Sequence, residues 1–88
     1  MPLAGTLQTG PTGSEGELER AIRATIARAA GDLKRVDYRG LNPDARVQYD
    51  TAKRFVQQAE DAVRLKNLGF ARNLADKAAA LATQLAGR

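Results

Sequence analysis

Residues 45–85 read ARVQYDTAKRFVQQAEDAVRLKNLGFARNLADKAAALATQL, and small apolar residues recur along them at steps of three and four. The recurrence breaks at Lys66-Asn67-Leu68-Gly69 and then resumes. Its period is that of an α-helix, written twice with a turn between. The segment therefore predicts two antiparallel helices whose contact face is mostly alanine. The positions expected at this contact are Ala45, Tyr49, Ala52, Phe55, Val56, Ala59, Ala62, Val63, Ala71, Leu74, Ala75, Ala78, Leu81, Ala82 and Leu85.

The boundaries of these helices are marked by local signals. Asn42-Pro43-Asp44 places an N-cap residue, a proline at the first helical position and an acid behind it. Asn67 suits the left-handed residue that ends many helices. We expect the two helices at about 43–66 and 69–86.

An earlier helix precedes this pair. Ser14 followed by Glu17 has the form of a capping box, and the acids Glu15, Glu17 and Glu19 suit a helix N-terminus. The pattern predicts a helix at about 15–36. Its apolar stripe consists of Leu18, Ile22, Ile26, Ala29, Leu33 and Val36.

The predicted fold class is all-α: an antiparallel three-helix bundle with helices at about 15–36, 43–66 and 69–86. Residues 1–13 are rich in Thr, Pro and Gly and carry no charged side chain, so we expect a flexible tail there. Residues 14–88 then form a single three-helix domain. With so few large residues, two arrangements stay open: a self-contained bundle, or a helix 15–36 that needs a partner or a second copy.

Composition narrows the chemistry. The chain has no cysteine and no histidine, so disulfides and Cys/His metal sites are excluded. The ten acidic residues are scattered, and Ser14 is the only serine and is interpreted as a cap. No phosphate-binding glycine loop occurs. We therefore predict no enzyme activity, no cofactor, no metal and no catalytic residue.

Charge and hydropathy bear on partners and compartment. The formal charge is +4, from 14 basic and 10 acidic residues, which suits only weak attraction to anions. No apolar run is long enough to cross a membrane. Residues 1–5 lack the basic start and apolar centre of a secretion signal, so either the protein is not exported or a leader has been removed.

The predicted function is a non-catalytic helical module for protein interaction or self-assembly. Amphipathic helices bind one another through anchors at i, i+3, i+4 and i+7, and such anchors form either the core or an interface. The candidate interaction residues are Leu18, Ile22, Ile26, Tyr38, Phe55 and Phe70. For Tyr38 the competing interpretation is a loop anchor folded over the helix ends.

The alternative function is weak binding to nucleic acid or another anionic surface through the Arg/Lys-rich helix faces. Acids interleave with these cations, and no helix-turn-helix spacing or stacking aromatic pair occurs. We therefore expect a protein partner, or a second copy in a homo-oligomer, rather than nucleic acid.

We call the recurring small apolar residues of 45–85 the alanine ladder. Part of this ladder resembles a tetratricopeptide repeat over about residues 52–85. Phe55, Ala59, Ala62, Ala71, Ala75 and Ala78 fall where that repeat places its small and aromatic residues. The segment 67–71 is similar to the entry of its second helix. Phe55 stands where tryptophan is usual, and one unit occurs where solenoids need about three. The resemblance implies a tetratricopeptide-like hairpin with a binding role.

A second resemblance is compositional. A Thr/Pro/Gly-rich lead-in followed by an Ala-rich hairpin with the motif at 72–78 is similar to the C-terminal domain of uncharacterised bacterial envelope proteins, often lipoproteins. This resemblance implies a cell-envelope or periplasmic context and an interaction role, and it brings no known site.

Overall fold

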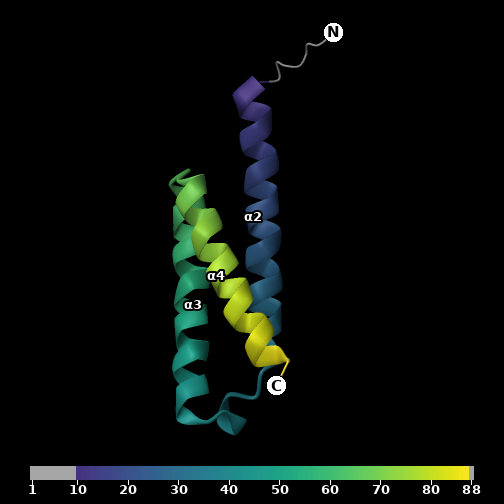
Figure 1. Cartoon of the computed structure of the whole chain (residues 1–88). Helices are drawn as coiled ribbons and strands as arrows, with labels where there is room; N and C mark the ends of the chain where they lie inside the picture. The colour runs from purple at the N-terminus through teal and green to yellow at the C-terminus, as the bar shows by residue number, and fades with distance from the viewer. Residues whose placement is uncertain (1–9, 88) are drawn as a thin grey trace.

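Three α-helices and one short 3₁₀ turn make up the fold (Figure 1). The computed structural model describes residues 10–87, and this part of the chain holds no strand. The helices are α2 (Gly10–Lys34), α3 (Pro43–Arg64) and α4 (Leu68–Ala86), and the 3₁₀ turn η1 is Tyr38–Gly40. α3 runs antiparallel to both neighbours, so α2 and α4 point the same way (Figure 1). The predicted all-α, three-helix fold is confirmed.

The start of α3 follows the predicted cap. The Asn42 side chain accepts a hydrogen bond from the Ala45 backbone N–H at 2.8 Å, and Pro43 occupies the first turn. Proline costs nothing there because its missing N–H would have had no partner within the helix. The beginnings predicted for the second and third helices are correct to within one residue.

The predicted start of the first helix is wrong. α2 begins at Gly10, so Ser14 lies inside the helix and is not its cap. A proline in the first turn does not interrupt a helix, and extending a helix adds a hydrogen bond for each residue fixed. Residues 10–13 therefore belong to α2 and not to the predicted tail, whose remaining residues, 1–9, lie outside the described part.

α4 is the central element, because it packs extensively against both α2 and α3, whereas α2 and α3 touch each other less. The predicted alanine contact is present: Ala59 of α3 and Ala75 of α4 are both fully buried. Small side chains allow two helix backbones to approach toward the lower end of the usual 8–10 Å separation. The fully or almost fully buried alanines are Ala29, Ala45, Ala52, Ala59, Ala71, Ala75, Ala78 and Ala82.

α2 contributes bulky aliphatic side chains to the core. Ile22, Ile26 and Leu33 are each at most 5% exposed and belong to the same apolar cluster as the hairpin alanines. The other end of α2 projects beyond the α3–α4 turn (Figure 1), and Glu15 and Glu17 are exposed there. The three helices therefore share one core, and α2 covers the α3–α4 hairpin with only part of its own length.

Replacing Ala75 by leucine should destabilise the fold by about 1–3 kcal/mol, because the closely spaced helices leave no room for three more carbons. Ala80 on the exposed side of the same helix is the matched control, and Ala80→Leu should change stability by less than about 0.5 kcal/mol. Urea unfolding followed by circular dichroism measures both. Equal stability of the two variants would contradict the close contact.

Candidate interaction surface

Three of the predicted candidate residues hold α2 on the hairpin. Ile22 and Ile26 are 2% and 5% exposed, and Leu18 is half-buried against the core. Leu18 and Ile22 line a shallow groove between α2 and α4, facing Arg72 and Ala75. These three side chains therefore pack within the chain.

Tyr38 anchors the α2–α3 connection. Its ring meets that of Tyr49 edge to face at 5.1 Å, and its hydroxyl donates to an Asp50 carboxylate oxygen at 3.3 Å. The Arg46 guanidinium lies 5.4 Å from the Tyr38 ring centroid and donates to the Tyr38 and Arg39 carbonyl oxygens. These contacts match the loop-anchor interpretation, although 39% of the residue remains exposed.

Phe55 and Phe70 differ in exposure. Phe55 is half-buried at the edge of the core, with the Lys77 ammonium 5.9 Å from its ring centroid. Phe70, in the first turn of α4, is 54% exposed. Of the six predicted candidates, Phe70 is the one whose ring is mainly open to solvent.

Leu65 lies beside Phe70 and was not among the predicted candidates. It is 79% exposed, and the two side chains line one shallow groove with Gln58, Asp61, Ala62 and Asn67. We call Leu65 and Phe70 the turn patch. The signal for Leu65 was present in the sequence, since it follows Ala62 by three residues and so continues the helical ladder.

The turn that carries this patch is fixed by a Schellman motif. The Asn67 N–H donates to the Ala62 carbonyl and the Lys66 N–H to the Val63 carbonyl, both at 2.9 Å. Lys66 takes the left-handed conformation, with φ 62°, whereas Asn67 has φ −89°. The prediction that Asn67 takes that conformation was wrong, because α3 ends two residues earlier than expected, at Arg64.

Lys66→Gly should be more stable than Lys66→Ala by about 1 kcal/mol, because only glycine adopts positive φ without a Cβ clash. Both variants lose the lysine side chain, so their difference isolates the backbone. Thermal unfolding of the two proteins side by side measures it. An alanine variant as stable as the glycine variant would exclude the left-handed residue at this position.

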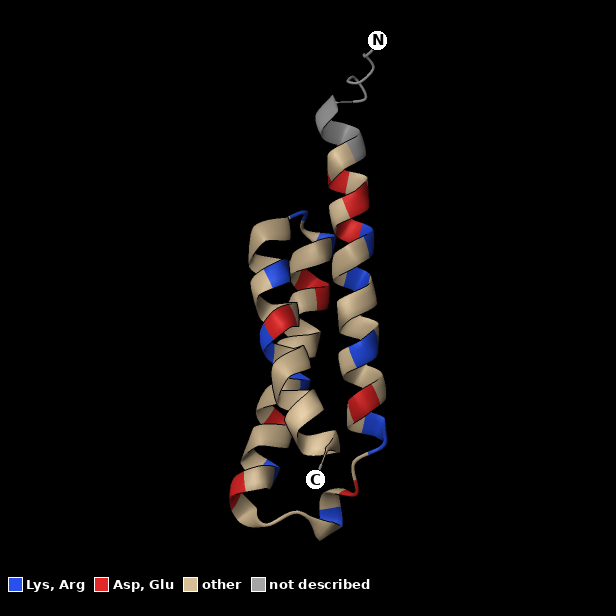
Figure 2. Cartoon of the chain, turned by 45° about the vertical axis from the view of Figure 1, so that its right-hand side comes forward, with Lys and Arg blue, Asp and Glu red and all other residues tan. Residues whose placement is uncertain are grey.

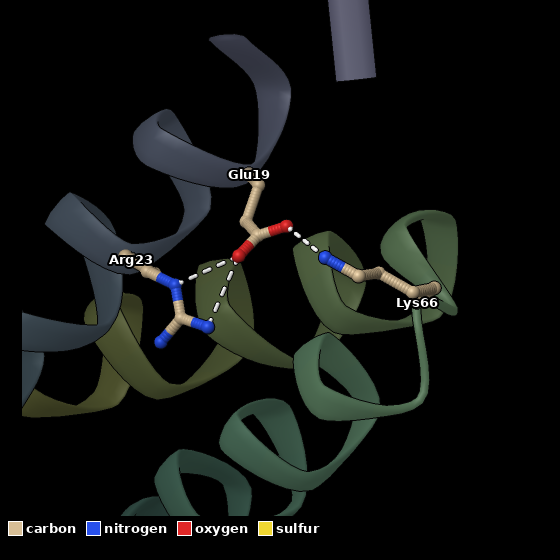
Figure 3. A network of polar contacts seen from close by, with 3 residues as sticks. All are labelled: Glu19, Arg23 and Lys66. Carbon is tan, nitrogen blue, oxygen red and sulfur yellow. Dashed lines mark hydrogen bonds and ion pairs between the residues drawn. The ribbon is translucent and has the colours of Figure 1, made fainter. Parts of the chain in front are cut away.

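A small ionic network ties α2 to the same turn (Figure 3). The Lys66 ammonium lies 2.9 Å from one Glu19 carboxylate oxygen, and Arg23 contacts the other through Nε at 3.1 Å and Nη2 at 3.0 Å. The hydrogen bond from Lys66, and then that from Arg23, lower the pKa of Glu19 below its ordinary value of 4.5. Glu19 and Lys66 are 47 residues apart, so this pair fixes how α2 sits along the hairpin.

The network predicts a pH dependence. Because the pKa of Glu19 is lower in the folded than in the unfolded protein, its stabilising effect is present above pH 4.5 and is lost as the pH falls through the lowered folded pKa. Wild type should therefore melt above Glu19→Gln at about pH 7, and the gap should close toward about pH 3. Glu60→Gln, an exposed control on α3, should show no such gap at either pH.

Charges are distributed unevenly over the surface. Figure 2 shows acidic positions near the start of α2 and both basic and acidic positions farther along it, while the second half of α4 carries neither. Of two further ion pairs, Asp61–Arg64 lies within α3, and Asp32–Arg35 joins the last turn of α2 to the residue that follows the helix. Across residues 10–87, no three acidic side chains gather in a way that could hold a metal ion. Of the helices described, none is long and apolar enough to span a membrane.

Comparison of the chain with protein-family models, with curated proteins and with solved structures finds no match. The tetratricopeptide and envelope-protein resemblances therefore stay predictions from the sequence.

Proposed function

We propose that this chain is a non-catalytic helical protein-interaction module whose working surface is the turn patch. One observation carries the proposal: Leu65 and Phe70 lie side by side in one groove at 79% and 54% exposure. Single exposed apolar residues are common on protein surfaces, but adjacent large ones rimmed by polar groups are typical of contact sites.

The composition around the patch supports this function. Gln58 and Asn67 border the groove with uncharged amides, and the carboxylate in it, Asp61, is paired with Arg64. Interface centres are depleted of charge and enriched in aromatic residues. A partner that covers the groove therefore buries apolar area and removes few charges from water.

The patch is also held in place before any partner arrives. The Schellman hydrogen bonds fix the backbone between Leu65 and Phe70, and the Glu19–Lys66 pair ties the turn to α2. A preorganised surface loses less conformational entropy on binding than a mobile loop. This rigidity favours recognition of a defined partner.

A second candidate function uses the outer face of α2. Arg20, Arg28 and Lys34 are exposed there, and none of them forms an ion pair within residues 10–87. A row of unpaired cations attracts phosphate groups, and such binding weakens steeply with salt. This face supports weak binding to nucleic acid or another anionic surface as the alternative.

A photo-crosslinking amino acid at position 70 tests the main proposal. Expressed in cells, it should capture a discrete protein or a second copy, whereas the same group at exposed Ala27 on α2 should not. Leu65→Ser, introduced into the position-70 crosslinker chain, should weaken capture without unfolding the domain, because Leu65 is exposed. Identical products from positions 70 and 27 would contradict the proposal.

The same proteins separate the remaining alternatives. Sedimentation at about 10 μM and about 1 mM shows whether the captured partner is a second copy. Binding to nucleic acid that disappears between about 50 and about 300 mM salt, and that survives Phe70→Ser, would favour the α2 face instead.

A further inference from the structure

The turn patch is one end of a longer seam on the hairpin. On α3, Phe55, Ala62 and Leu65 lie on one edge, and on α4, Phe70, Lys77 and Leu81 lie on the edge that faces it. Their separations of three, four and seven residues, or sums of these, follow a heptad spacing. These residues span about three helical turns along each helix.

This seam lies on the side of the hairpin that α2 does not cover. Val56 and Glu60 line a groove between α3 and α2, and Arg72 and Asp76 line another between α4 and α2. Ala62, Leu65 and Phe70 line the groove on the other side. The α3–α4 pair thus already binds one helix, α2, and presents a second, similar seam to solvent.

The seam carries two charged residues: Asp61, which is paired with Arg64, and Lys77, near its middle. The Lys77 ammonium covers the Phe55 ring and forms no ion pair within the described residues. On the occupied side of the hairpin, a lysine of the turn, Lys66, is met by a carboxylate from the helix that packs there, Glu19. On the open side, Lys77 has no such partner within the described residues, because the carboxylate there, Asp61, pairs with Arg64.

We propose that the open seam binds an amphipathic helix of another protein, with apolar anchors on either side of one carboxylate that meets Lys77. This inference rests on the proposed function and specifies its partner. Apolar anchors at heptad spacing would fill the ends of the seam at the turn patch and at Leu81. The carboxylate would form an ion pair with Lys77, the one cation on the seam that has no partner within the described residues.

Charge disfavours a second copy as the occupant. Lys77 lies near the middle of the hairpin, so a two-fold axis through the seam would bring Lys77 against its own copy. Like charges facing each other in an apolar contact are destabilising, and they select against the wrong partner. A helix with a carboxylate at that point has no such penalty.

Two synthetic helices of about 18 residues test the inference with the full chain. They carry leucines at heptad spacing and differ only at one central face position, which is glutamate in one and lysine in the other. Fluorescence polarisation should show the glutamate peptide binding about fivefold more tightly. Lys77→Glu should reverse the preference, whereas Lys53→Glu, on the α2 side of α3, should leave it unchanged.

The outcomes separate this inference from the proposed function. If Phe70→Ser weakens both peptides but Lys77→Glu does not alter their ratio, the turn patch stands and the carboxylate partner is overturned. If Phe70→Ser changes neither affinity, both proposals fail. A chain that dimerises at the peptide-binding concentration, and loses the dimer on Phe70→Ser, would assign the seam to a second copy.

Discussion

The close approach of α4 to both of its neighbours is the constraint on which the rest of the structure depends. α4 presents buried residues around much of its circumference, and most of them are alanine. An alanine surface has little volume, so it is buried well only if the helix opposite comes near. The larger buried side chains come from α2 (Ile22, Ile26 and Leu33) and from α4 itself (Leu68, Leu74 and Leu85).

This spacing has a consequence at the end of the hairpin. A contact spaced for alanine has no room for a phenyl ring, so Phe70 cannot enter the α3–α4 interface without forcing the helices apart. Leu65 lies beyond the last turn of α3, where no third helix covers it. The turn patch is therefore where the domain has apolar area left to bind something else.

The features that were predicted correctly from the sequence are those that local interactions determine. The Asn42–Pro43 boundary and the alanine ladder were correct, because capping and helical periodicity act within a few residues. The predicted start of α2 was wrong because the sequence allows two starts there: a capping box at Ser14, or a helix that runs unbroken from Gly10. Local rules do not rank such alternatives.

What the sequence could not predict depends on contacts between helices. Periodicity shows that Ile22 and Phe70 both lie on apolar faces, but not that α2 covers one side of the hairpin and leaves the other open. The Glu19–Lys66 pair depends on the position of α2 along the hairpin. A shift of α2 by one helical turn, about 5.4 Å, would break the pair. For the same reason the exposure of Leu65 had to come from the structure.

The placement of charge favours surface recognition over buried chemistry. Every charged side chain from residue 14 to residue 87 lies wholly or partly in solvent, where water screens it and single pairs contribute little to stability. Such charges act mainly on which partner binds and in which register. In this chain Glu19 and Lys66 already set the register of one helix against the hairpin. Lys77 lies where it would set the register of a second helix, because it is the one charge on the seam that has no ion-pair partner within residues 10–87.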